Sequence, residues 1–81
     1  MKTAAQILLE DEDRLYAFVV EAAKDNGSVS ESVLRAYWYR LGRRGAYVEL
    51  LLDRLVRAGR LTWKHNESKR GIIYPGDTSN A

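Results

Sequence analysis

The chain has 81 residues, which is enough for one small domain with a single hydrophobic core. It contains no cysteine, so a disulfide framework and thiolate chemistry are excluded, and its only histidine is His65, so we expect no metal site. No apolar stretch is long enough for a signal peptide or a membrane span, and we therefore expect an intracellular protein with no membrane contact.

The net charge of +2 hides an uneven distribution of charge along the chain. Residues 1–33 carry three basic residues against seven acids, a net charge of −4, whereas residues 34–81 carry ten basic residues against four acids, a net charge of +6. A surface built from the second half would be positive, and the commonest partner of such a surface is a phosphate backbone. Ordinary solvating charge is the alternative interpretation.

The first segment, residues 1–11, is expected to form a short helix or arm. Thr3 and Gln6 have the capping-box spacing, and the apolar residues Ile7, Leu8 and Leu9 follow as a candidate dimer element. Asp11 would lie on the apolar stripe of one continuous helix, so we expect a break near it. The acidic run Glu10–Asp13 then suits the solvated start of a second helix, where the macrodipole favours negative charge, better than it suits a magnesium site.

A domain is expected over residues 12–75, beginning with a helix that keeps apolar spacing from Leu15 to Ala23 and stops at Asn26-Gly27. Ser30 is the expected N-cap of the next helix, with Val29 and Leu34 forming a hydrophobic staple. This helix should bury one face and end at Gly42, the face being Leu34, Tyr37, Trp38 and Leu41.

A further helix is expected from about Arg44 to the stop at Gly59, with an inward stripe of Val48, Leu51, Leu52, Leu55 and Val56. Alternation then predicts a strand over 61–64, a polar loop over 65–70 and a returning strand over 71–74. We expect Leu61 and Trp63 to share a face with Ile72 and Tyr74. Pro75 should end the hairpin, and residues 76–81 should form a flexible tail.

This order of helix, helix, short turn, helix and β-hairpin resembles the winged helix-turn-helix superfamily over roughly residues 12–75. The stretch that carries the resemblance is LLLDRLVRAGRLTWKHNESKRGIIY, in which a leucine-rich helix leads into a strand, a basic loop and an apolar strand. The resemblance implies a mainly α, α+β fold with a three-helix core and a wing. It also implies that the third helix enters the major groove of DNA while the wing touches phosphates or the minor groove.

The third helix and the wing supply the candidate DNA contacts when they are sorted at 100° per residue. They are Arg43, Arg44, Ala46, Tyr47, Leu50, Arg54, Lys64, His65, Lys69 and Arg70. Arg43 and Arg54 lead, because guanidinium groups suit both guanine edges and phosphates. Tyr47 has an equal alternative as a half-buried ring against the second helix.

Three residues of the third helix oppose this interpretation. Glu49 and Asp53 are unfavourable near phosphates, and Asp53 is expected to pair with Arg57 on the helix surface. Leu50 fits either a thymine methyl group or a protein contact.

The leading hypothesis is a small regulator or accessory factor of transcription, of viral or plasmid type, that binds double-stranded DNA in the cytoplasm or nucleoid as a homodimer. The alternative is a protein-interaction module of a transcription or replication assembly, which would bind its protein partner through the Leu50 face. A third hypothesis is binding of RNA or unusual duplexes by stacking on Tyr47 or Trp63. No constellation of catalytic residues is recognisable, so we expect neither an enzyme nor a cofactor.

Overall fold

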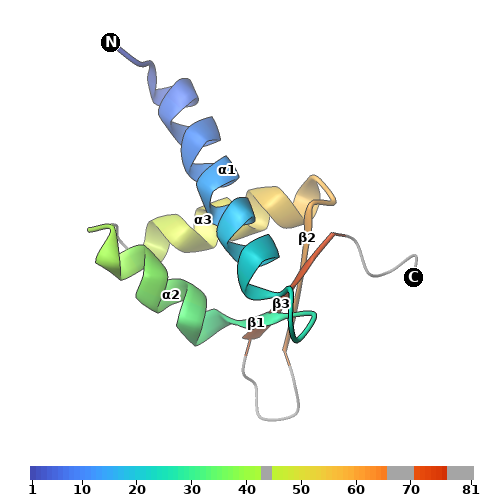
Figure 1. Ribbon diagram of the computed structural model, residues 1–81. Coiled ribbons are helices and arrows are strands. Elements are labelled where there is room, and N and C mark those ends of the chain that lie inside the picture. The colour runs from blue at the N-terminus through green and yellow to red at the C-terminus, as the bar shows by residue number, and fades with distance from the viewer. Residues whose placement is uncertain (43–44, 66–70, 77–81) are drawn as a thin grey trace.

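The computed structural model describes residues 1–42, 45–65 and 71–76. Its elements in chain order are α1 (Ala4–Ala22), β1 (Val29–Ser30), α2 (Glu31–Arg40), α3 (Gly45–Arg57), β2 (Leu61–His65) and β3 (Gly71–Pro75), as Figure 1 shows. The strands form an antiparallel sheet in the order β1-β3-β2. The expected α+β class, with three helices and a β-hairpin, is confirmed at this level.

Helix α1 is continuous, so the break expected near Asp11 is wrong. The capping box at its start is confirmed: the Gln6 backbone N–H donates to Thr3 Oγ1 over 3.1 Å, and the Thr3 N–H donates to Gln6 Oε1 over 2.8 Å. The acidic run Glu10–Asp13 therefore lies in the middle of a helix rather than at the start of one. Asp11 is tolerated on the buried side because a residue of α3 provides its hydrogen-bond partner, as described below.

Helix α2 begins at the predicted cap, since Ser30 Oγ accepts a hydrogen bond from the Val33 N–H over 3.3 Å. Val29 and Leu34 on either side of this cap are both buried, as a hydrophobic staple requires. Leu41 is an exception among the predicted core residues. It is 36% exposed because it follows the last helical turn, where the chain departs towards Gly42 in the left-handed region at φ 74°.

The face of β3 that lies beside Leu61 and Trp63 is not the expected one. Trp63 lies opposite Ile73 and Thr62 opposite Tyr74, and directly opposed residues of an antiparallel pair point to the same face. Leu61 and Trp63 therefore share a face with Ile73, which is fully buried, and not with Ile72 and Tyr74. The expectation failed because β3 is apolar on both faces, so alternation alone could not choose between them.

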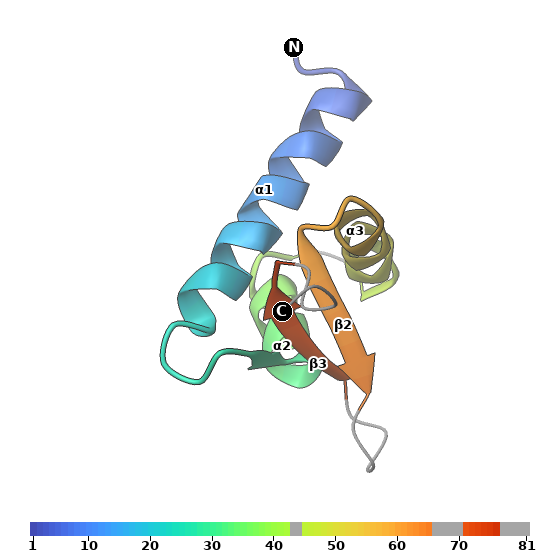
Figure 2. The ribbon, with the colours of Figure 1, turned by 90° about the vertical axis from the view of Figure 1, so that its right-hand side faces the viewer.

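One buried cluster joins all six elements. It comprises Leu15, Val19, Val29, Leu34, Trp38, Val48, Leu51, Leu52, Leu55, Leu61 and Ile73. The inward stripe predicted for α3 is confirmed, with Val56 at its half-buried edge. Helix α1 crosses α3, and its N-terminal turns project beyond the rest of the domain in both views (Figures 1 and 2).

Candidate functional site

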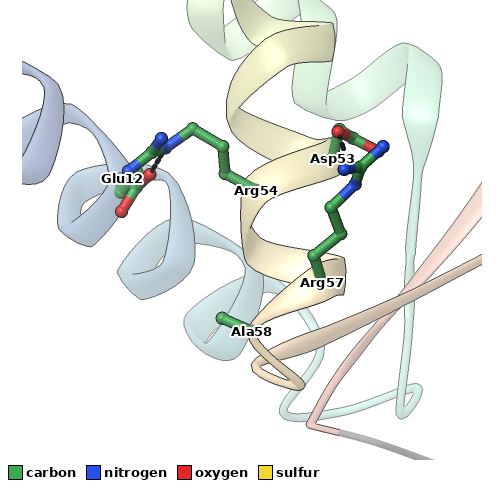
Figure 3. Close-up of a pocket in the computed structure, with 5 residues that line it drawn as sticks. All are labelled: Glu12, Asp53, Arg54, Arg57 and Ala58. Atoms are coloured by element: carbon green, nitrogen blue, oxygen red, sulfur yellow. Dashed lines mark hydrogen bonds and ion pairs between the residues drawn. The ribbon is translucent and has the colours of Figure 1, made fainter.

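Two carboxylates of α1 hold two side chains of α3. Asp11 and Glu12 are only 4% and 7% exposed. The Tyr47 hydroxyl donates to Asp11 Oδ2 over 2.9 Å, and Arg54 Nε forms an ion pair with Glu12 (Figure 3). Buried charges need such partners, because an unpaired carboxylate in the interior is strongly unfavourable. Tyr47 and Arg54, both candidate DNA contacts, thus already bind groups of the chain itself.

The rest of the acidic run is paired as well. Lys2 Nζ lies 2.9 Å from Glu10 Oε2, and Arg60 Nη1 lies 3.2 Å from Asp13 Oδ1. The Arg60 guanidinium also stands 4.3 Å from the centre of the Tyr16 ring, a cation–π geometry. The interpretation of this run as a solvated helix start is therefore wrong. Three of its four carboxylates join α1 to α3 and to the residue before β2.

The opposite flank of α3 is joined to α2 by a second set of charges. Arg35 Nη2 lies 2.7 Å from Glu49 Oε1, and Arg35 Nε lies 3.6 Å from Glu31 Oε2. The hydrogen bond to Glu49 is the main cause that raises the pKa of Arg35 above its ordinary value, and burial opposes it. Glu49 therefore serves to hold α2 and α3 together, a role that a view of α3 alone does not suggest.

The outer face of α3 is electrically balanced within the described residues. Helix α3 carries two bases, Arg54 and Arg57, and two acids, Glu49 and Asp53. The predicted pair of Asp53 with Arg57 is confirmed at 3.0 Å, whereas Arg54 pairs with Glu12 of α1 and Glu49 with Arg35 of α2. An open groove of about 420 Å³ lies here, lined by Glu12, Asp53, Arg54, Arg57 and Ala58, and each of its charged side chains belongs to an ion pair (Figure 3).

Leu50 and Ala46 are the exposed apolar residues of this face. Leu50 is 49% exposed, whereas Val48, Leu51, Leu52 and Leu55 on the opposite side of the same helix are buried.

The rings proposed for stacking on bases are partly covered. Tyr47 is half-buried with its ring centre 6.0 Å from that of Trp38, which confirms the alternative of a ring packed against α2. Trp63 is half-buried, and its ring centre lies 5.6 Å from that of His65. Gly71 is buried beside Trp63, and a Cβ added there would come within 2.8 Å of Trp63 Nε1.

The basic residues divide into paired and unpaired groups. Of the nine in the described part of the chain, six form ion pairs with described carboxylates: Lys2, Lys24, Arg35, Arg54, Arg57 and Arg60. The other three, Arg14, Arg40 and Lys64, have no ion pair with a described residue.

Arg40 ends α2 and Lys64 lies near the end of β2, followed by His65; all three side chains are exposed. The candidate contacts Arg43, Arg44, Lys69 and Arg70 lie outside the described residues but are close to these positions in sequence. Of the three described bases without a described ion pair, Arg14 lies in α1, whereas Arg40 and Lys64 lie beside the α2–α3 turn and near the end of β2.

Within residues 1–42, 45–65 and 71–76, no helix is both long and apolar enough to cross a bilayer, and no cluster of three or more potential metal ligands occurs. Comparison of the chain with protein-family models, with curated proteins and with solved structures returned no match.

Proposed function

We propose that this domain is a winged-helix DNA-binding protein, a regulator or accessory factor of transcription, whose duplex contacts come from the α2–α3 turn and the β2–β3 loop. The observation that carries the proposal is the division of the basic residues. Arg54 and Arg57 of α3 and Arg60 before β2 form ion pairs with carboxylates, whereas Arg40 and Lys64, like Arg14 of α1, have no described ion-pair partner. The observed order of helix, helix, turn, helix and hairpin is also the one that the winged helix-turn-helix resemblance implies.

The physical basis is neutralisation of phosphate charge, which releases counterions and provides most of the affinity of small DNA-binding domains. The start of α3 adds backbone N–H groups that favour phosphate, and Ala46 in its first turn is small enough for close approach to a groove. The middle of α3 contributes less in this proposal. Arg54 and Tyr47 would have to leave Glu12 and Asp11 before they could contact DNA.

The test measures, by fluorescence anisotropy, the binding of a labelled mixed-sequence DNA duplex at a series of salt concentrations. Arg40→Ala and Lys64→Ala should each weaken binding and reduce the slope of log affinity against log salt by about 1. Lys24→Ala is the matched control, because it removes the same charge from an exposed lysine beyond the end of α1. Absence of duplex binding at about 50 mM salt, where electrostatic affinity is strong, would contradict the proposal.

A protein-interaction module is the second candidate, and exposed Leu50 on a charge-balanced helix face favours it. Leu50→Glu separates the two functions. Loss of a protein partner with unchanged duplex affinity supports the interaction module, whereas an altered preference among DNA sequences places Leu50 in the groove.

A further inference from the structure

Two side chains on one flank of α3 are held by α1. Tyr47 and Arg54 stand about two turns apart on the same side of α3. The Tyr47 hydroxyl donates to Asp11, and the Arg54 side chain extends from α3 to Glu12, as Figure 3 shows for the second pair. Neighbouring carboxylates of one helix thus bind neighbouring polar groups of the other.

This contact lies where α1 enters the domain. Asp11 and Glu12 are the first buried residues of α1. The turns before them project past α3 in both views, with Ile7 and Leu9 exposed and Leu8 half-buried (Figures 1 and 2). The ion pair is therefore at the edge of the domain, where a partner in solution can approach it.

Glu12 offers Arg54 the same kind of partner as a phosphate does, an anionic oxygen that accepts from the guanidinium group. Glu12 belongs to the same chain and is present at a high effective concentration, whereas a phosphate has to be recruited from solution. Departure of Arg54 would also leave Glu12, whose side chain is 10% exposed, without its cation. Arg54 therefore stays with Glu12 when a duplex approaches.

Arg57, one turn further along α3, is not restrained in this way. Its partner Asp53 is 54% exposed, and Figure 3 shows the Arg57 side chain turned towards it along the same helix. A pair between exposed groups exchanges one partner for another at little cost. The restraint thus acts on Arg54, whose partner belongs to another helix and is buried.

We propose that Glu12 is autoinhibitory: it competes with DNA phosphate for Arg54 and, together with Asp11, keeps one flank of α3 from contributing to duplex affinity. The inference rests on the proposed DNA-binding function and concerns its regulation. Stability alone does not account for the pair, because apolar residues of similar volume generally pack at such a position at least as favourably. The affinity of the domain is then set by α1 as well as by the bases that touch DNA.

The test is Glu12→Gln in the same anisotropy assay. The substitution keeps the shape of the side chain and an acceptor oxygen but removes the charge that restrains Arg54. The variant should bind the duplex at least about threefold more tightly than the wild type, and its slope of log affinity against log salt should steepen by about 0.9, the value for one additional phosphate contact. Circular dichroism verifies that each variant is folded.

Glu10→Gln is the matched control. It is the same substitution in the same acidic run, but the Glu10 side chain is 55% exposed and pairs with Lys2 on the projecting turns. It should leave the salt slope unchanged. An equal gain in Glu10→Gln and Glu12→Gln would show that only the overall charge of the chain had changed.

Two further measurements connect the gain to Arg54. The double variant Glu12→Gln/Arg54→Gln has the net charge of the wild type and should return to wild-type affinity and slope. The nuclear magnetic resonance signal of the Arg54 Nε–H group should shift on addition of duplex in Glu12→Gln and stay in place in the wild type.

The proposal is overturned by a Glu12→Gln variant that binds no more tightly than the wild type, by a double variant that keeps the gain, or by an Arg54 signal that already shifts with duplex in the wild type. If the wild type binds the duplex and Glu12→Gln brings no gain, only the restraint is refuted. If neither protein binds, DNA binding is refuted as well. Binding by Glu12→Gln alone would support the restraint and contradict duplex binding by the wild type.

Discussion

The hydroxyl of Tyr47 donates a hydrogen bond to Oδ2 of Asp11 across 2.9 Å, joining residues 36 positions apart in the sequence. Asp11 is 4% exposed, so this contact is made largely out of water. Asp11 interrupts the apolar stripe of α1, but through this hydrogen bond it connects α1 to α3. The stability of the α1–α3 contact should therefore depend on polar side chains as well as on the core.

Tyr47→Phe should lower the free energy of unfolding by about 1–2 kcal/mol, because it leaves a buried carboxylate with one donor fewer. For a domain of this size, a loss of 1 kcal/mol lowers the melting temperature by about 4–8 °C. Urea denaturation followed by circular dichroism measures the change. Tyr39→Phe is the control, since Tyr39 is 61% exposed. Equal effects of the two substitutions would contradict the assigned role of Tyr47.

Arg54→Ala should destabilise the domain by about 1–3 kcal/mol, because Glu12, whose side chain is 10% exposed, loses the cation that compensates its charge. The full cost of breaking a buried pair is not expected, because the Arg54 side chain is 44% exposed and partly screened by water.

Arg57→Ala is the neighbouring control on the same helix. Its side chain is 80% exposed and pairs with Asp53, which is itself 54% exposed, so we expect a change of at most about 0.5 kcal/mol. If Arg54→Ala and Arg57→Ala had the same urea midpoint, the Arg54–Glu12 pair would contribute no more to stability than a surface ion pair does.

Gly71→Ala should destabilise the hairpin by about 1–3 kcal/mol through overpacking. The new methyl group would lie 2.8 Å from Trp63 Nε1 and 2.9 Å from Glu31 Cβ, closer than side chains approach one another. The emission of Trp63 should shift as the indole moves. Gly27→Ala serves as the comparison, because it adds a methyl group in open space and strains only the backbone at φ 79°. An unchanged emission spectrum in Gly71→Ala would argue against this contact.

Ser30→Ala should cost about 1 kcal/mol, since it removes the acceptor that caps the first turn of α2. Ser32→Ala, at an exposed position of the first turn of the same helix, should change the free energy of unfolding by only a few tenths of a kcal/mol. Thermal melts of the two variants provide the comparison.

The sequence predicted correctly those features that depend on residues within one short segment of the chain. Thr3 and Ser30 cap helices as expected, Gly42 and Gly59 adopt positive φ, and the leucine stripe of α3 is buried. These features depend on backbone sterics and on the helical period, which a single chain segment determines.

Contacts between distant segments could not be inferred in this way. Asp11 on the apolar stripe of α1 was interpreted as a helix break, because an acid there needs a partner. That partner is Tyr47, 36 residues later, on a helix whose packing against α1 the sequence does not reveal. Strand β1 was not anticipated, since two residues carry no periodic pattern, yet it pairs with Ile72 and Ile73 on the far side of the hairpin. The same limit applies to the candidate contacts: helical periodicity placed Arg54 outward, but did not show that Glu12 would bind it.

The pairing of the acidic run with α3 and Arg60 also affects the electrostatic field that a charged partner meets at long range. Opposite charges a few ångströms apart form short dipoles, whose fields decay faster with distance than the field of a single charge. The acids of the first half thus screen part of the basic second half, and the distant field comes mainly from charges without such partners, among them the bases Arg40 and Lys64. A net charge of +2 therefore understates how strongly these positions can orient the protein before contact, an effect that added salt will suppress within about 10 Å at 0.1 M.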